Sequence, residues 1–172
     1  MQEIIDLLSD KTIKPTIKRE TLSSWISESK IDALEVINFA KTQKDAIKAT
    51  CIEAFEFVTQ KDKSFASPEL FTFAVESLQD KAPRTKWESA KVVGNIAEKF
   101  PNELEIAIAH LLQNTEHEGT VVRWAAAFAL GEIVKLKTKQ QADLMELIQG
   151  ICEREEKNSI RKIYEKALKK IK

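Results

Sequence analysis

The feature that most constrains this chain is a segment that occurs twice, 37 residues apart. Residues 85–99 read TKWESAKVVGNIAEK, and residues 120–135 read TVVRWAAAFALGEIVK. This register places Trp87 on Trp124 and Gly94 on Gly131. A repeat of this length is typical of helical solenoids, whose units bury their apolar faces only by stacking on their neighbours.

Apolar residues recur with helical spacing along nearly the whole chain, and the 172 residues include only four glycines and four prolines. We therefore predict an all-α fold. Ser67 and Asn102 are expected to cap two of the helices, Asn102 together with Glu105 in a capping box, and Asn158 to cap the last. The last helix is predicted at about residues 159–171, and the helices without a predicted cap span about residues 3–8, 16–27, 31–41, 45–60, 84–99, 120–135 and 140–154.

The repeat divides the chain into helical pairs, each with a first and a second helix. Residues 1–30 are the least regular part and are interpreted as an N-terminal cap. Four repeats are predicted to follow within one continuous domain, at residues 31–66, 67–101, 102–138 and 139–172. A chain of 172 residues is long enough to bury a core without metal or disulfide support.

The overall charge is balanced, with 27 basic and 27 acidic residues, so the molecule as a whole has no field that favours nucleic acid or an anionic membrane. The excess of bases is concentrated at the C-terminal end, where residues 154–172 contain eight Lys/Arg and three Asp/Glu. The sequence leaves open whether these bases form a binding face or only a solvated helix.

Cys51 and Cys152 lie singly within apolar helical patterns, which is typical of buried, reduced thiols. The N-terminus has no basic region followed by an apolar run, and the longest apolar segment, residues 124–130, is too short to cross a bilayer. These features predict a soluble, cytoplasmic protein with no membrane partner.

The segment from Val122 to Gly131, VRWAAAFALG, resembles the second-helix signature of HEAT-repeat proteins: a valine and an arginine followed by small residues, leucine and glycine. The resemblance in period covers residues 31–172, although Lys48 and Lys86 stand where that family has arginine. It implies a right-handed superhelix of antiparallel helix pairs, and a binding scaffold far more often than an enzyme.

In a solenoid of this kind the second helices line the concave surface. Projected at 100° per residue, Trp124 and Phe128 fall opposite the apolar face of their helix. The surface is expected to run from an acidic end, Glu53 and Glu56, through aromatic residues to a basic end. The candidate binding residues are Trp87, Lys91, Trp124, Phe128, Lys135, Lys162, Lys166 and Lys169.

Two alternatives remain open at this point. The indoles of Trp87 and Trp124 either line a groove or pack between repeats, with the glycines allowing close helix approach. A second recurring set, with one basic residue in each repeat, either bridges acidic residues of neighbouring turns or binds phosphate; its members are Lys48, Lys86, Arg123 and Arg161.

Catalytic motifs are absent: the sequence has no nucleophile elbow, phosphate-binding glycine loop or dinucleotide fingerprint. His110 and His117 are not spaced for a zinc site with cysteine, so we predict neither a metal nor a cofactor. The leading hypothesis is a non-enzymatic scaffold that binds a protein or peptide on its concave face. The alternative is a nucleic-acid-binding protein related to the HEAT-like DNA alkylation-repair glycosylases.

Overall fold

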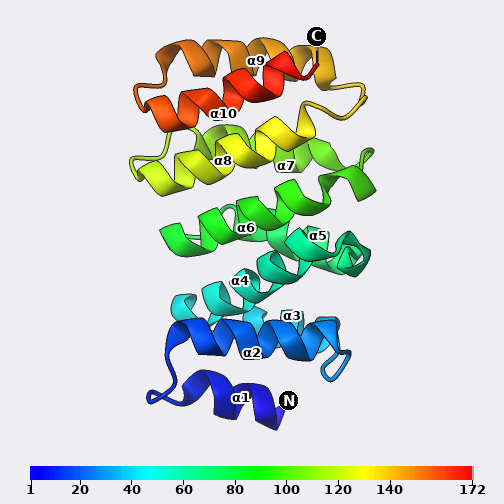
Figure 1. Ribbon diagram of the computed structural model, residues 1–172, viewed down its shortest axis with the longest axis vertical. Coiled ribbons are helices and arrows are strands. Elements are labelled where there is room, and N and C mark those ends of the chain that lie inside the picture. The colour runs from blue at the N-terminus through cyan, green and yellow to red at the C-terminus, as the bar shows by residue number, and fades with distance from the viewer. Residues whose placement is uncertain (172) are drawn as a thin grey trace.

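The computed structural model describes residues 1–171, which form ten α-helices and no strand. The helices follow one another as five hairpins stacked along a single axis (Figure 1). The first helices are α1 (Gln2–Ser9), α3 (Ala33–Lys41), α5 (Pro68–Ser77), α7 (Leu104–Asn114) and α9 (Gln141–Arg154). The second helices are α2 (Pro15–Ser27), α4 (Asp45–Lys61), α6 (Pro83–Ile96), α8 (Thr120–Ile133) and α10 (Asn158–Lys169).

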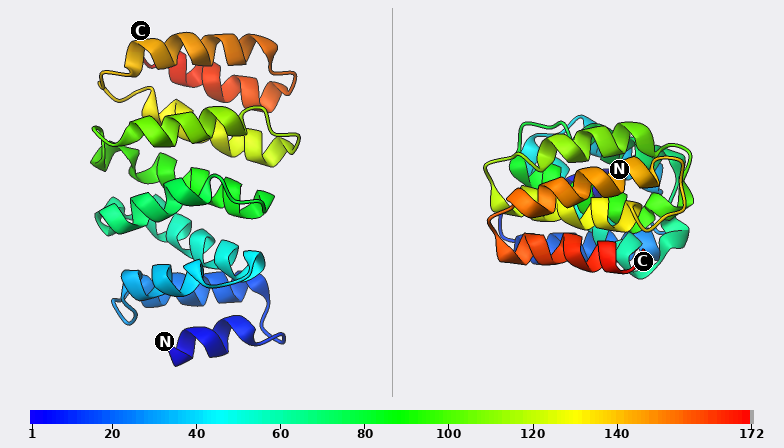
Figure 2. Two further views of the ribbon diagram at one scale, coloured as in Figure 1. Left: turned by 180° about the vertical axis from the view of Figure 1, so that it is seen from behind. Right: turned by 90° about the horizontal axis from the view of Figure 1, so that it is seen from above.

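The hairpins produce two layers of helices, one on each side of the stack (Figure 2). The second helices pack one on the next from α2 to α10, and the contacts of α6 with α4 and α8 are the most extensive. The first helices touch one another much less. We call these two sides the second-helix layer and the first-helix layer. The predicted all-α fold of stacked hairpins is confirmed, while the division into a cap and four repeats stays a prediction.

The helix ends follow the breakers in the sequence, with differences at two caps. Ser67 caps α5, and its Oγ accepts a hydrogen bond from the backbone N of Leu70 at 3.1 Å. The capping box predicted at Asn102 and Glu105 is wrong: α7 begins only at Leu104, and no side chain caps it. Asn158 is already the first residue of α10, so it does not cap that helix either. Two short 3-10 helices, η1 (Lys63–Phe65) and η2 (Ala97–Lys99), follow α4 and α6.

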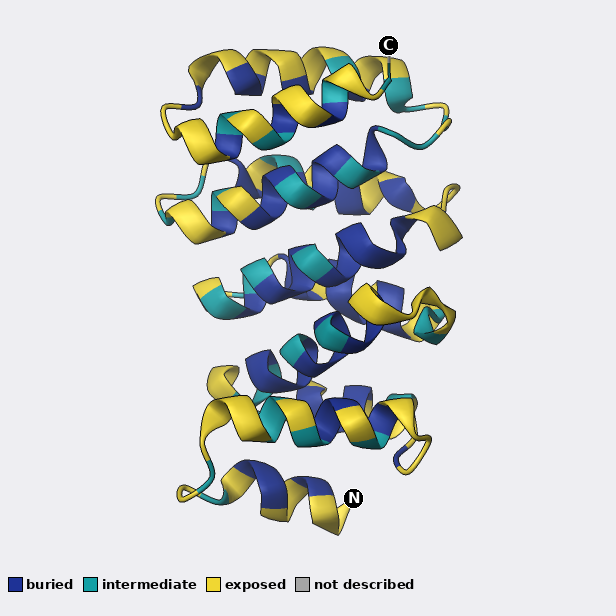
Figure 3. Ribbon diagram, viewed as in Figure 1, coloured by how far each residue is buried: buried dark blue, intermediate teal, exposed yellow. Residues whose placement is uncertain are grey.

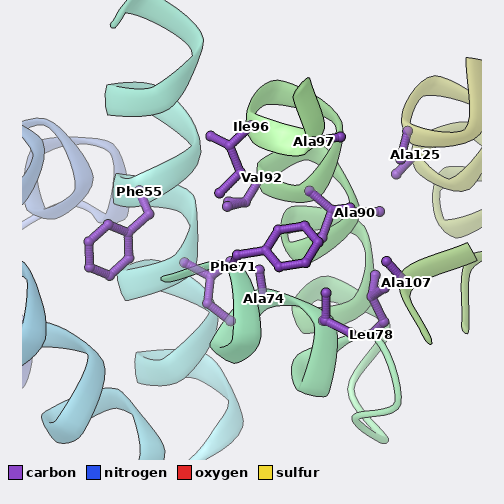
Figure 4. Close-up of a cluster of buried hydrophobic side chains, with 14 of the residues drawn as sticks. Phe55, Phe71, Ala74, Leu78, Ala90, Val92, Ile96, Ala97, Ala107 and Ala125 are labelled. Carbon is purple, nitrogen blue, oxygen red and sulfur yellow. The ribbon is translucent and has the colours of Figure 1, made fainter. Parts of the chain in front are cut away.

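The core lies between the two layers and runs without a break along the stack, as the buried inner surfaces of the helices show (Figure 3). Alanine makes up much of α8, so α6 and α8 approach closely. Leu130, predicted to face inward, is fully buried. Both cysteines are free and buried, as predicted. Figure 4 shows side chains from five of these helices and from the segments after α5 and α6 meeting in the core: Phe55, Phe71, Ala74, Leu78, Ala90, Val92, Ile96, Ala97, Ala107 and Ala125.

Three of the recurring basic residues connect their hairpin to the next one. The predicted bridge to an acidic residue is confirmed for Lys48 and Arg123, whereas Lys86 binds a neutral side chain. Lys48 Nζ lies 2.6 Å from Asp80, after α5, and Arg123 binds Glu155, after α9. Lys86 Nζ donates to Asn114 Oδ1 at 3.2 Å. Arg161 belongs to the last hairpin and forms no salt bridge with any residue from 1 to 171.

Candidate functional site

A groove on the second-helix layer, between α8 and α10, brings together four of the eight candidate residues. Its volume is 250 Å³. We call it the α8–α10 groove. The four candidates in its lining are Trp124, Phe128, Lys135 and Lys166, and the other lining residues are Gly131, Glu132, Ile163, Ala167 and Lys170.

Two aromatic side chains form one wall of the groove. Trp124 and Phe128 lie one helical turn apart on α8, and their rings are stacked with centroids 6.2 Å apart and planes within 5°. Trp124 is 39% exposed, so part of its indole is open to a ligand. Of the two alternatives that the sequence left open for this residue, the exposed one is correct.

Phe128 is held in place by a glycine on the neighbouring second helix. A Cβ built on Gly94 of α6 would lie only 2.7 Å from Phe128 Cε1 and 3.1 Å from the Cα of Ala129. Because glycine has no Cβ, the phenyl ring can rest on the backbone of α6. This contact explains why a glycine is needed at Gly94, and it limits the movement of the Phe128 ring toward α6.

The floor of the groove consists of small residues from both helices. A Cβ on Gly131 would lie 3.3 Å from the Cβ of Ala167 and 3.7 Å from Ile163 Cγ2. The missing side chain therefore allows α8 and α10 to approach. The apolar surface at the bottom of the groove belongs to Ala167 and Ile163 as well as to the aromatic wall.

The rim of the groove carries three lysines and one carboxylate, which gives it a net positive charge. Lys135 pairs with Glu132 on the same turn of helix. Lys166 and Lys170 are exposed, and neither forms a salt bridge within residues 1–171. Lys170 and Ile163 were missed by the sequence reasoning, although Ile163 lies one turn before Lys166 on α10 and Lys170, directly after the helix, lies four residues beyond Lys166.

The remaining four candidates do not line the groove. Lys162 and Lys169 are exposed on α10. Trp87 is half-buried against the core, and its Nε1 donates a hydrogen bond to Glu88 Oε1 at 2.8 Å. It therefore does not share a groove with Trp124, despite their equivalent places in the repeat.

Lys91 is occupied by carboxylates of the protein itself. Its Nζ lies 2.8 Å from Glu88 and 3.4 Å from Glu56. Burial alone would lower the pKa of Lys91, but the hydrogen bond and negative charge of Glu88, helped by Glu56, outweigh it and raise that pKa. Lys91 thus contributes to the packing of α6 on α4.

The acidic end expected at Glu53 and Glu56 is not a free acidic surface. Glu53 lies 2.6 Å from Arg84 of α6 and 3.4 Å from Arg19 of α2, so its charge is compensated from both sides. Glu56 is buried, and this burial raises the pKa of its carboxyl group. The predicted gradient is wrong at this end, because cross-helix ion pairs that sequence spacing does not reveal neutralise it.

The part of the chain from residue 1 to 171 contains neither a candidate metal-binding cluster nor a candidate membrane-spanning helix. No three or more His, Cys, Asp or Glu side chains in this part are arranged to hold a metal ion. None of its helices is both long and apolar enough to cross a bilayer.

The sequence matches no protein-family model and no curated protein. Among solved structures, the chain is similar to a designed armadillo repeat protein in complex with the peptide (KR)4, with a TM-score of 0.71 and 12% identity over 98% of this chain and 80% of that chain. A second designed armadillo repeat protein aligns over 99% of each chain at 11% identity with a TM-score of 0.48. Ten helices in stacked hairpins and the similarity to the first of these structures lead to one conclusion: the chain has the fold of a HEAT/armadillo-like helical solenoid.

Proposed function

We propose that this protein is a binding scaffold whose α8–α10 groove takes an acidic peptide segment bearing a large apolar side chain. The observation that carries the proposal is the combination, in one groove, of the exposed Trp124 indole with the lysines Lys166 and Lys170, which have no carboxylate partner within residues 1–171. Such grooves bind amphipathic peptides through apolar anchors and read charge at the rim.

The size of the groove fits a side chain better than a whole small molecule. Its 250 Å³ are open along the helices, whereas sites for small ligands are concave cavities of about 300–1,000 Å³ that bury most of the ligand. A leucine or phenylalanine of a peptide would contact Trp124, Phe128 and Ile163, while the backbone of the peptide continues along the layer.

The positive charge of the rim favours a negatively charged partner. Lys135, Lys166 and Lys170 surround the apolar floor, and only Glu132 opposes them. Acidic residues flanking the apolar anchor would therefore be attracted, and basic residues would be repelled. The designed armadillo repeat protein with the peptide (KR)4 shares the fold with this chain; it supports the idea that this architecture can hold a peptide, but a peptide of that charge does not suit this groove.

Nucleic acid fits the same layer less well. Backbone binding requires a row of cations that follows successive phosphates. Arg19 of α2 and Arg84 and Lys91 of α6 are all paired with Glu53, Glu56 or Glu88. These three bases are thus neutralised by the protein itself, whereas Lys166 and Lys170 at the C-terminal end of the layer lie together at one groove and form no salt bridge within residues 1–171, which suits a short acidic segment.

Two fluorescent peptides test the proposal. Both contain two leucines one helical turn apart. The residues around the leucines are glutamates in one peptide, the glutamate peptide, and lysines in the other, the lysine peptide. The glutamate peptide should bind with saturation, and the lysine peptide should not compete for this site. We expect Trp124→Ala to weaken binding by roughly thirtyfold, as for an aromatic hot spot. Lys166→Glu with Lys170→Glu should weaken it by about tenfold or more.

Two matched variants control for changes outside the groove. Ile17→Ala truncates an exposed apolar side chain on α2, and Lys44→Glu reverses an exposed lysine before α4. Both should bind the glutamate peptide as the wild type does. The proposal fails if Trp124→Ala binds this peptide unchanged, or if single-stranded DNA binds at moderate salt and displaces it.

A further inference from the structure

A second cavity lies on the first-helix layer, away from the groove between α8 and α10. It measures 640 Å³ and opens between α5 and α7. The first helices, which form the outer layer of the stack, contact each other far less than the second helices do. We call this cavity the outer groove.

The outer groove has an apolar floor that is already fixed by the core. Phe71 and Val75 of α5 are buried, and the ring of Phe71 stacks on Phe100 with centroids 4.6 Å apart. On the opposite side Ile106 of α7 is 62% exposed, the largest exposed fraction among the large apolar side chains of residues 1–171. An isoleucine this open, beside a preformed apolar floor, indicates a contact surface.

Acidic residues surround this floor. Glu76 of α5, Glu103 before α7 and Glu105 in its first turn all line the groove, and no lysine or arginine does. Glu76 lies 3.7 Å from Lys41 of α3, whereas Glu103 and Glu105 form no salt bridge within residues 1–171. The one basic ring in the lining, His110, points its Nδ1 at the carbonyl oxygen of Val75, 3.2 Å away.

We infer that the outer groove docks a basic partner segment that inserts one or two large apolar side chains between α5 and α7. The apolar floor and Ile106 supply the contact area, and Glu103 and Glu105 attract the flanking lysines or arginines. This charge preference is the reverse of that of the α8–α10 groove. Because the two grooves lie in different helix layers, an acidic and a basic partner can be held at the same time (Figure 1).

The lysine peptide described above is the probe for this site. It should bind the full chain with saturation and should not displace the glutamate peptide. Ile106→Ser, and separately Glu103→Gln with Glu105→Gln, should each weaken its binding by about tenfold. Since these side chains are exposed, the variants should melt close to the wild type, which checks that the fold is kept.

Helix α9, in the same layer, provides matched controls. Leu147→Ser removes a similarly exposed apolar side chain, and Glu146→Gln with Glu153→Gln removes two exposed carboxylates. These variants should bind the lysine peptide as the wild type does. Lys166→Glu with Lys170→Glu should also leave this binding intact, so a failure here is separable from a failure of the proposed function.

Three results would overturn the inference. In the first, the lysine peptide would show no saturable binding to the wild type. In the second, it would bind the glutamine and serine variants of the outer groove as well as it binds the wild type. In the third, sedimentation of the wild type alone shows association that Ile106→Ser abolishes, and the occupant is then a second copy of this chain.

Discussion

Arg123 of α8 and Glu155, which follows α9, form two hydrogen bonds, at 3.1 Å from Nε and 3.4 Å from Nη2, across the boundary between neighbouring hairpins. Nη1 of the same guanidinium donates to the carbonyl oxygens of His117 and Glu118 in its own hairpin. Arg123 therefore connects the loop before its own helix to the end of the next first helix. Lys86 repeats both connections, to the carbonyl oxygen of Leu78 and to Asn114 Oδ1. Lys48 repeats only the connection to the next hairpin, at Asp80.

Replacement of Arg123 should destabilise the stack, whereas replacement of its counterpart in the last hairpin should not. Arg123→Met leaves Glu155, whose side chain is only 7% exposed, with an uncompensated charge, and we expect a loss of about 2–4 kcal/mol in the free energy of unfolding. Arg161→Met removes no salt bridge within residues 1–171 and should change stability by less than about 0.5 kcal/mol. Urea unfolding of both variants checks this; equal losses would contradict the role assigned to the inter-hairpin pair.

The Arg123–Glu155 pair should also make the stability of the protein depend on pH. Burial alone would raise the pKa of Glu155, but the hydrogen bond and charge of Arg123 and the backbone N–H of Lys157 lower it below its ordinary value of 4.5. A carboxyl group with a lowered folded pKa stabilises fully above its unfolded pKa and loses this contribution as the pH falls through the folded value. The advantage of the wild type over Glu155→Gln, measured by urea unfolding, should shrink from near pH 7 to about pH 3. An advantage independent of pH would show that the charge of Glu155 is not involved.

Gly94→Ala should be destabilising although alanine is the better helix former. The added methyl would meet the ring of Phe128 at 2.7 Å and the backbone of Ala129 at 3.1 Å, and overpacking of this kind costs about 1–3 kcal/mol. Gly150→Ala is the control, because nothing lies within 4 Å of its Cβ position in α9, and it should stabilise by about 0.5–1 kcal/mol. In thermal melts, the melting temperature should fall for Gly94→Ala and rise for Gly150→Ala. A higher melting temperature for Gly94→Ala would rule out the close contact with Phe128.

Truncation of the core of α8 tests the stacking itself. Leu130 is fully buried, and Leu130→Ala should cost about 2–5 kcal/mol through lost burial and the cavity left behind. Leu147→Ala makes the same change on α9 at a side chain that is 48% exposed, and it should cost less than about 0.5 kcal/mol. Denaturant unfolding compares the two, and an unchanged midpoint for Leu130→Ala would contradict the inward face of α8.

The fold could be predicted from sequence because a solenoid is built from local periodicity. The recurrence of Trp87 at Trp124 and of Gly94 at Gly131 determines the pairing of helices, and the alanine-rich run of α8 indicates close packing. Helix starts were harder to place. The residue before α7 is Glu103 rather than the predicted cap Asn102, because the preceding segment first completes a turn in which the N–H of Glu103 bonds to the carbonyl of Phe100 at 3.0 Å.

The candidate site could be predicted only in part. Helical projection placed Trp124 and Phe128 on the open side of α8, since that depends on one helix alone. It could not show that Arg19 and Arg84 neutralise Glu53, because these residues come from three helices, α2, α4 and α6. It also missed the outer groove, which depends on the distance between α5 and α7 rather than on a pattern within either helix.

The fluorescence of Trp124 is the most direct test of the proposed groove. In a Trp25→Phe, Trp87→Phe variant, Trp124 is the only indole left in the chain. Titration with the glutamate peptide should shift its emission to the blue with saturation, because the peptide removes water from the exposed part of the ring. The variant Lys166→Glu with Lys170→Glu should need about tenfold more peptide, or a larger excess, to reach the same shift. An emission spectrum that stays unchanged while the peptide binds would place the peptide elsewhere and contradict the account.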